Sequence, residues 1–199
     1  MTRTVFIDIE TDSLDATKIY CAVTLEGGKY IEWISGTTLQ EYLDDAIVVA
    51  HNGLSFDFPV LAKLWNVRLK LENMRDTLVL SMMDNPAREG GHSLKSWGER
   101  LGSAKIEFND FSQYTGEMME YCKQDVKLCS QVYNYLQHTL QEFSPKSVSD
   151  EHRMRIVADR ISHNGFGLDK DKAVLLYNSL VLEQEQIEKE CRNLFPPIV

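Results

Sequence analysis

The chain has 199 residues, of which 43% are hydrophobic, and 30 acidic against 21 basic residues give it a formal charge of −9. This length suits one domain, or one domain with an appendage, and allows a sizeable core. The sequence has no run of about 18 apolar residues and no basic region followed by an apolar stretch, so we expect neither a transmembrane helix nor a secretory signal. The acidic balance disfavours a non-specific duplex binder, because phosphate contacts need Lys and Arg.

The first fifty residues predict a sheet. Three segments alternate or are rich in β-branched residues, so we expect strands at 3–9, 19–25 and 29–34. Gly27 and Gly28 lie between the second and third strands, which is a hairpin signal. A short helix capped by Thr37 or Thr38 follows, and then a fully apolar strand at 46–50.

The next segments predict three helices. The first begins near Asp57 and has an apolar inner face, and the second covers 78–83. The third covers 94–101, between a Ser93 cap and Gly102.

The remainder of the chain predicts longer helices. After a polar stretch at 103–116, apolar residues at three- and four-residue steps predict a helix over 116–141. Pro145 is expected to break the chain, and two further helices are expected near 149–163 and 170–194.

The cysteines indicate a reduced protein without structural zinc. The four thiols form no CxxC pair and do not cluster with histidines: Cys21, Cys122, Cys129 and Cys191. Cys122 and Cys129 lie two turns apart on the longest predicted helix, so we expect them to pack as small apolar side chains.

Four carboxylates carry the candidate chemistry. Asp8 and Glu10 share one face of the first strand, because side chains i and i+2 point the same way. Asp57 closes a segment that follows a buried strand, and Asp125 shares a helix face with Tyr121. If the four converge, they form an oxygen-only pocket that can hold two divalent cations, the arrangement used to cut phosphodiesters.

Each of these features also has an ordinary structural interpretation. A D-x-E pair on a strand is usually structural, and Asp57 could simply cap its helix. Tyr121 could be a core tyrosine beside a solvated Asp125. Taken singly, each structural interpretation is the better one, but coincidence explains the set of three poorly.

Three segments resemble the Exo motifs of the DEDD 3′–5′ exonucleases: Asp8-Ile9-Glu10-Thr11, Asn52-x3-Phe56-Asp57 and Tyr121-x3-Asp125. The tyrosine in the third motif is typical of the tyrosine subgroup, found in proofreading domains of family A DNA polymerases. The chain resembles the proofreading domains of podovirus-type phage polymerases. Segments 92–102 and 150–166 are also similar to those polymerases, so the resemblance covers nearly the whole chain.

Two features depart from the family pattern. The sequence stops at Val199, where such a polymerase would continue, which implies a separately encoded or a truncated exonuclease. Phe56 stands where tyrosine is common, which removes a hydroxyl and keeps the apolar ring.

The resemblance implies the fold and the domains. The expected fold is α/β and ribonuclease-H-like, with a mixed central sheet flanked by helices and the site at the strand ends. It places the exonuclease domain at 1–143 and a C-terminal helical extension, similar to the lead-in to a polymerase domain, at 144–199.

The resemblance also implies roles for individual residues. A two-cation site of Mg²⁺ or Mn²⁺ would be held by Asp8, Glu10, Asp57 and Asp125. Tyr121 would orient the attacking water or the scissile phosphate. Four residues would contact the substrate, Leu14 as a wedge between the last two bases: Thr11, Leu14, Asn52 and Phe56.

Several other polar residues are expected to be structural. Asp76 is expected to cap a helix or bond to the core, and His51 and His92 are expected to be structural rather than ligands. Three basic residues could touch a nucleic-acid backbone, but we interpret them as part of a solvated face: Lys95, Arg100 and Lys105.

The expected function is metal-dependent 3′–5′ exonuclease action on single-stranded or frayed DNA, with release of nucleoside 5′-monophosphates. The expected role is proofreading for a separately encoded family A phage DNA polymerase, in the cytoplasm of the host. One alternative is an exoribonuclease or oligonucleotidase of the same superfamily, because no residue is identified that senses a 2′-OH. Another is a non-catalytic polymerase-docking module, although the intact carboxylates argue against it.

Overall fold

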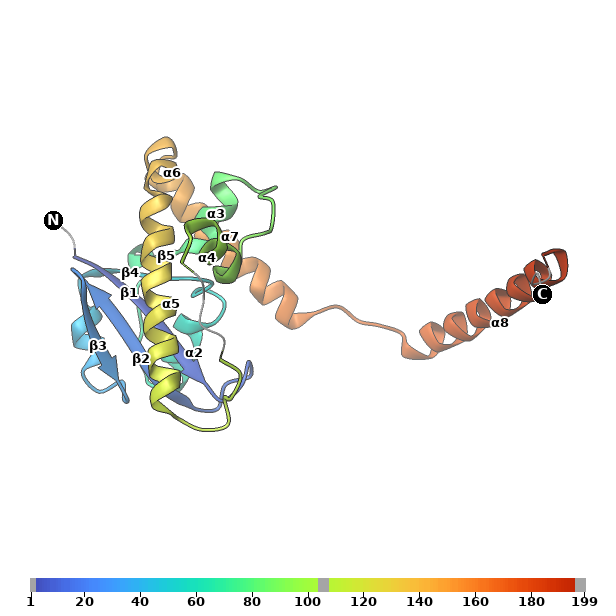
Figure 1. The fold of residues 1–199 in the computed structure, drawn as a ribbon, viewed down its shortest axis with the longest axis horizontal. Coiled ribbons are helices and arrows are strands. Elements are labelled where there is room, and N and C mark those ends of the chain that lie inside the picture. The colour runs from blue at the N-terminus through green and yellow to red at the C-terminus, as the bar shows by residue number, and fades with distance from the viewer. Residues whose placement is uncertain (1–2, 104–107, 196–199) are drawn as a thin grey trace. The chain divides into compact units, whose positions relative to one another are not determined.

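A computed structural model describes residues 3–103 and 108–195 (Figure 1). The chain divides into two units, Met1–Arg160 and Ile161–Val199, which are described separately. The helices and strands are, in order, β1 Arg3–Thr11, β2 Ile19–Glu26, β3 Lys29–Trp33, α1 Leu39–Leu43, β4 Ala46–Ala50, α2 Asp57–Leu64, the 3₁₀ helix η1 Leu71–Asn73, β5 Met74–Asp76, α3 Thr77–Asp84, α4 Leu94–Leu101, α5 Gly116–Tyr135, α6 Gln137–Glu142, α7 Pro145–Asn164 and α8 Lys170–Leu194.

The first unit is built on a mixed sheet of five strands in the order β3-β2-β1-β4-β5. The central strand β1 pairs antiparallel with β2 and parallel with β4. The four strands predicted from the sequence are confirmed. The fifth, β5, was missed because its three residues are too few to show a periodicity, and only its pairing with the end of β4 defines it.

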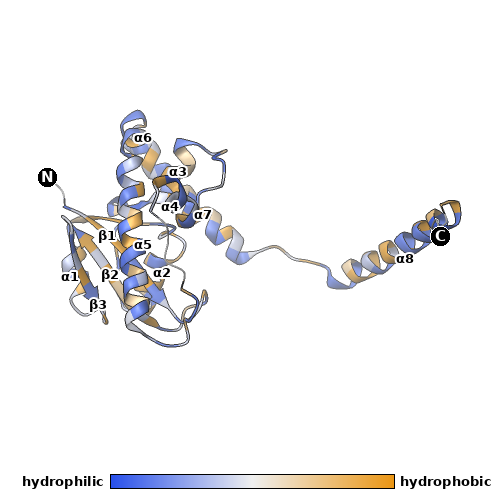
Figure 2. Ribbon diagram, in the orientation of Figure 1, coloured by the Kyte–Doolittle hydropathy of each residue, from blue (hydrophilic) through white to orange (hydrophobic). Residues whose placement is uncertain are grey.

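The two faces of the sheet have different covers, because side chains alternate along β1. One set of alternate residues is buried in the cluster that includes residues of α1 and α2: Val5, Ile7 and Ile9. Phe6 points to the other face and packs against the cluster formed with α5. Figure 1 shows α5 crossing that face, and Figure 2 shows the apolar strands beneath it. The alternation therefore directs Asp8 and Glu10 towards α5.

The helix predicted over 116–141 is in fact two helices, α5 and α6, which meet at Leu136. Leu136 is fully buried and keeps the apolar spacing. The apolar pattern therefore continues across a junction at which the helix itself is interrupted. The predicted break near Pro145 is present at residues 143–144, but the next helix begins at Pro145 rather than near residue 149. Pro145 is the first residue of α7, a position where its missing N–H costs no helix hydrogen bond.

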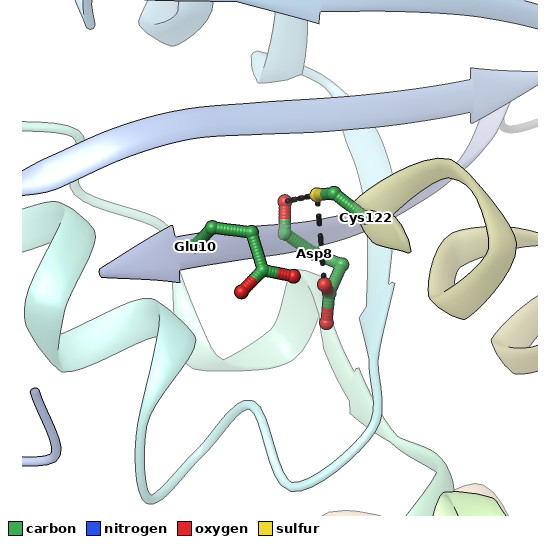
Figure 3. A group of neighbouring side chains, drawn as sticks. All are labelled: Asp8, Glu10 and Cys122. Atoms are coloured by element: carbon green, nitrogen blue, oxygen red, sulfur yellow. Dashed lines mark hydrogen bonds between the residues drawn. The ribbon is translucent and has the colours of Figure 1, made fainter. Parts of the chain in front are cut away.

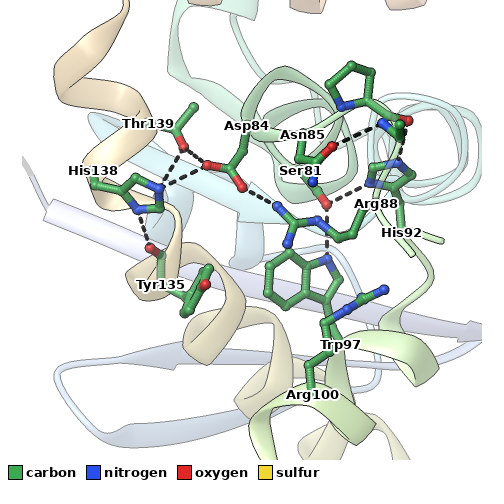
Figure 4. Close-up of polar contacts among 12 residues, drawn as sticks. Ser81, Asp84, Asn85, Arg88, His92, Trp97, Arg100, Tyr135, His138 and Thr139 are labelled. Carbon is green, nitrogen blue, oxygen red and sulfur yellow. Dashed lines mark hydrogen bonds and ion pairs between the residues drawn. The ribbon is translucent and has the colours of Figure 1, made fainter. Parts of the chain in front are cut away.

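A polar network fixes the segment between α3 and α4 (Figure 4). The Ser81 hydroxyl accepts a hydrogen bond from Trp97 Nε1 at 3.1 Å and contacts His92 Nδ1 at 2.8 Å. Asp84, at the end of α3, accepts a hydrogen bond from Thr139 Oγ1 of α6 at 2.6 Å. His92 thus has the structural role predicted for it.

The second unit contains the end of α7 and the helix α8, whose predicted span of 170–194 is confirmed. Asp169 caps α8, and none of the residues of α8 is buried. Among the described residues, no helix is both long and apolar enough to cross a lipid bilayer. The division of the chain into functional domains at residue 143 stays a prediction.

His152 of α7 is a buried imidazole that bonds to the edge of the sheet. Its Nε2 accepts a hydrogen bond from the backbone N–H of Asp76 at 2.9 Å, and its Nδ1 donates to the carbonyl of Val148 at 2.8 Å. This pair of bonds requires the neutral ring. The pKa of His152 is lowered to about 4, chiefly by burial and to a smaller extent by the nearby charge of Arg75, while the bond to Val148 opposes the shift.

We expect His152 to make stability depend on pH. The folded pKa lies below the ordinary value, so the unfolded state binds the proton first. The free energy of unfolding is unaffected by this group above about pH 6.5 and falls by about 1.4 kcal/mol per pH unit from there towards the folded pKa. Urea unfolding at a series of pH values measures it.

The control for this prediction is His152→Gln, which cannot titrate. Carboxylate contributions are common to both proteins and cancel in the difference. Between pH 6.5 and 4.5 the wild type is expected to lose about 2 kcal/mol more than the variant. Parallel curves would contradict a neutral buried His152.

Candidate functional site

The first part of the site lies between β1 and α5 (Figure 3). Asp8, Glu10 and Cys122 each offer one ligand atom, and these atoms all lie within 4.8 Å of one another. The thiol of Cys122 lies 3.6 Å from Asp8 Oδ2 and 3.4 Å from the carbonyl oxygen of Asp8. Cys122 is buried, as its predicted packing role requires, but its contact with Asp8 was not anticipated from the sequence.

The second part of the site comes from α2 and α5. Asp57 begins α2 and Asp125 lies one turn after Tyr121 on α5, and their side chains are only 3% and 4% exposed. The Asp57 carboxyl reaches the backbone of Ile9, between Asp8 and Glu10, and the charge of Asp125 acts on it. The structure thus brings the four predicted carboxylates together from three elements.

The electrostatics of the site favour a bound cation. The pKa of Asp57 is raised to about 7, chiefly by burial and further by the charges of Asp76 and Asp125, while backbone hydrogen bonds oppose the rise. Asp57 Oδ1 is buried and accepts no hydrogen bond from any described residue. A divalent cation would supply both the missing partner and the counter-charge, and clustered carboxylate oxygens suit hard cations such as Mg²⁺ or Mn²⁺.

Two aromatic residues surround the ring of Tyr121. The ring centroid of Phe108 lies 5.5 Å from that of Tyr121, and the centroid of Phe111 lies 6.3 Å from it. These contacts restrict the position of the Tyr121 ring. The sequence analysis missed both residues because they lie in a polar segment without periodicity.

A pocket of about 360 Å³ adjoins the carboxylates, and Glu10 lines it. The other lining residues include the predicted substrate contacts Thr11, Leu14 and Phe56, together with Phe111. Leu14 is 91% exposed, so its apolar side chain has no role in the core. The Thr11 hydroxyl donates to the carbonyl of Ser13 at 2.9 Å and helps to shape this turn.

The loop between β4 and α2 holds the fourth predicted contact, Asn52. Asn52 has a φ of 62°, a left-handed conformation that asparagine tolerates. The carboxylate of Asp76 accepts hydrogen bonds from the backbone N–H groups of Asn52 at 2.9 Å and Leu54 at 3.1 Å, and it also caps α3. The capping role predicted for Asp76 is confirmed, and it fixes the turn that leads into Asp57.

The same loop is held by a residue that the sequence analysis missed, Arg155 of α7. Its guanidinium donates to Asn52 Oδ1 at 3.1 Å and to Ser55 Oγ at 2.9 Å. Asp159, one turn along α7, accepts hydrogen bonds from Arg155 at 3.1 Å and from Ser55 at 2.6 Å. No local sequence pattern signals these contacts, because about a hundred residues separate the partners.

The remaining polar residues with predicted structural roles lie outside the carboxylate cluster. His51 Nδ1 bonds to Thr77 Oγ1 at 2.8 Å, which agrees with its predicted structural role. Lys95 is exposed, and Arg100 donates to the carbonyl of Gly91 at 2.8 Å. Lys105 lies outside the described residues.

Comparisons with known proteins show the family of the chain. A protein-family model described as 3′–5′ exonuclease matches residues 2–141. The chain is 26% identical to the DNA-directed DNA polymerase of Enterobacteria phage T3 and 25% identical to that of Escherichia phage T7, over 94% of its length in each case. It spans only 36% of the length of each of these polymerases.

Solved structures show the same fold. Brucella melitensis NrnC bound to pGG has a TM-score of 0.66 and 19% identity, covering 83% of this chain and 87% of that chain. The catalytic core of RRP6 from Trypanosoma brucei has a TM-score of 0.54 and 19% identity, covering 76% and 45%. The predicted α/β fold of the ribonuclease-H type is confirmed.

We expect Arg155→Met to loosen the loop around Asn52. The substitution removes the charge-assisted hydrogen bonds to Asn52 and Ser55 and leaves their oxygens without those donors. The free energy of unfolding should fall by about 1–3 kcal/mol. Backbone amides of residues 51–58 should exchange hydrogen faster, as measured by mass spectrometry.

Arg153→Met is the matched control, because Arg153 is an exposed arginine on the same helix. It should change neither stability nor exchange in the loop. Equal effects of the two substitutions would show that Arg155 does not hold this segment.

Proposed function

The chain belongs to the 3′–5′ exonuclease family, and on that premise we propose that it removes nucleotides one at a time from single-stranded or frayed DNA 3′ ends. The products are nucleoside 5′-monophosphates. The observation that carries this proposal is the convergence of Asp8 and Glu10 with Asp57 and Asp125, beside Tyr121. The confirmed resemblance to proofreading domains of phage family A DNA polymerases supports DNA as the substrate.

Asp8, Glu10, Asp57 and Asp125 are proposed to hold two divalent cations, Mg²⁺ or Mn²⁺. Bound there, the cations supply an activated water and stabilise the leaving 3′-oxygen. The orphaned oxygen of Asp57 and the raised pKa of that carboxyl support a cation at this place, because each is relieved by positive charge.

Tyr121 is proposed to orient the attacking water or the scissile phosphate through its hydroxyl. A phenol hydroxyl can donate a hydrogen bond to a water or to a phosphate oxygen. Phe108 and Phe111 keep its ring in place. The tyrosine is therefore a positioning group rather than a base.

The pocket beside Glu10 is proposed to receive the terminal nucleotide. Its volume of about 360 Å³ lies in the range typical of small-ligand sites. Phe56 and Phe111 offer aromatic surface to a base, and exposed Leu14 is placed to wedge between the last two bases. Thr11 and Asn52 are proposed to contact the substrate from the two flanking turns.

A second candidate substrate is RNA or a short oligonucleotide. The similarity to NrnC, solved with pGG, favours this alternative, because that structure covers 83% of this chain. The choice depends on groups near the sugar of the terminal nucleotide, and no described residue is identified that distinguishes a 2′-OH.

The proposed role is proofreading for a family A DNA polymerase that binds α8. One face of α8 carries exposed apolar residues, and among them Leu180 is 54% and Ile187 is 53% exposed. Apolar surface of this kind is usually covered by a partner. The similarity to the phage T3 and T7 polymerases supports a DNA polymerase as this partner.

The cleavage assay uses matched 5′-labelled DNA and RNA oligomers with Mg²⁺, Mn²⁺ or EDTA. We expect DNA to be shortened stepwise from its 3′ end with either cation and not with EDTA. Asp8→Asn should slow cleavage by about a hundredfold or more, because it removes a charged ligand at nearly constant shape.

Asp15→Asn is the control, since the Asp15 carboxylate lies in the adjacent turn and is fully exposed. It should cleave like the wild type. Faster cleavage of RNA would favour the second candidate, and no cleavage of either oligomer would leave the docking role as the better explanation.

The partner assay mixes the chain with the cognate polymerase on a sizing column. We expect co-elution, and we expect Leu180→Glu combined with Ile187→Glu to abolish it by placing charge in the apolar face. Glu183→Gln with Glu190→Gln, on the same helix, should still co-elute. Separate elution of the wild type at micromolar concentration would refute this partner.

A further inference from the structure

The carboxylate site contains a sulfur atom. Cys122 comes from α5 on the face that packs against β1, and its thiol lies 3.6 Å from Asp8 Oδ2 (Figure 3). The side chain is fully buried in the cluster that holds α5 to the sheet, so its position is fixed by packing. Across the β1–β2 ladder Glu10 is paired with Cys21, whose thiol is hydrogen-bonded to Cys122.

A sulfur among oxygen ligands changes which cations the site prefers. Mg²⁺ takes oxygen ligands and gains little from a thiol. Zn²⁺ and similar cations accept mixed sets, at about 2.3 Å to sulfur and about 2.0–2.2 Å to oxygen. We propose that Asp8, Glu10 and Cys122 form an oxygen–sulfur site that binds thiophilic divalent cations of the Zn²⁺ and Cd²⁺ class, which compete there with the hard cation used for cleavage.

The spacing of the three ligand atoms suits such a cation. Tetrahedral bonds of the lengths above place ligand atoms about 3.3–3.8 Å apart. The three atoms here are within 4.8 Å of one another, so shifts of about 1 Å or less at the side-chain ends bring them into range.

Asp57 gives independent evidence for a cation at this place. Its Oδ1 is buried, accepts no hydrogen bond within the described part of the chain, and belongs to a carboxyl that reaches the Ile9 backbone between Asp8 and Glu10. Asp57 therefore lies beside this group, although its oxygens are not among the atoms that lie within 4.8 Å of one another. Three protein ligands with a water in the fourth position are also a usual set for Zn²⁺.

Binding is a simple exchange at sulfur. The S–H bond of Cys122 breaks, a bond from sulfur to the cation forms, and the proton passes to solvent. No oxidant or reductant is needed. One proton is therefore released from the thiol for each cation bound.

The test titrates Cd²⁺ into the metal-free chain and follows the ultraviolet charge-transfer band of a thiolate–Cd²⁺ bond. Every protein carries Cys191→Ser, because Cys191 is exposed and would bind the cation adventitiously. We expect one equivalent per chain to produce the band. Cys122→Ser should lose it, while Cys129→Ser, which alters a buried thiol two turns along the same helix, should keep it.

A second variant covers the case in which Cys122→Ser does not fold, which circular dichroism reveals. Asp8→Asn keeps the thiol and should weaken Cd²⁺ binding at least about tenfold, since even residues outside a ligand set change metal affinity by about 10- to 100-fold. Three results would overturn the site: no band in the parent protein, a band that survives in folded Cys122→Ser, or unchanged affinity in Asp8→Asn.

Only one consequence of this inference, the inhibition of cleavage, rests on the proposed function. Zn²⁺ should inhibit Mg²⁺-dependent cleavage, and Cys122→Ser should need at least about tenfold more Zn²⁺ for half-inhibition. The two failures are distinguishable, because the Cd²⁺ band needs no DNA. A chain that shows the Cd²⁺ band but no cleavage would support this site and contradict the proposed function. A chain that cleaves DNA but shows no band would support the proposed function and contradict this site.

Discussion

Negative charge gathered between β1, α2 and α5 is the constraint around which the first unit is organised. Asp57 and Asp125 are almost completely buried, and Glu10 is 6% exposed. Placing like charges together in a region of low dielectric is unfavourable unless a cation or a proton compensates them. The surrounding structure therefore has to hold these carboxylates against their mutual repulsion. The sheet does so on one side and the packed face of α5 does so on the other.

The turn before Asp57 also helps to hold the carboxylates in position. Leu54 is buried in the core, Phe56 packs partly against it, and Asn52 has a left-handed conformation. Asp76 binds the backbone of this turn from β5, and His152 in turn binds the backbone of Asp76 from α7. Arg155 donates to Asn52 from α7. Hydrogen bonds thus add to apolar packing in fixing the position of the Asp57 carboxylate.

The sequence predicted those parts of the site that follow from the periodicity of a single strand or helix. Alternation along β1 predicted that Asp8 and Glu10 share a face, and helical spacing predicted the same for Tyr121 and Asp125. The sequence did not predict contacts between elements that only the tertiary structure brings together. Cys122 looked like a small core residue, and only the approach of α5 to β1 brings its sulfur to Asp8. The role of Arg155 and the strand β5 were not predicted for the same reason, because each is defined by a partner that lies far along the chain or in another strand.

The bonds from His152 and Arg155 bear on where this unit can be cut and rejoined. The family-model match ends at residue 141, whereas the first compact unit extends to Arg160. The two limits differ because residues of α7 hold the turn before Asp57. Anyone grafting this module onto another protein should carry the first four turns of α7 with it. A transplant that stops at residue 141 would deliver the carboxylates without the residues that hold this turn.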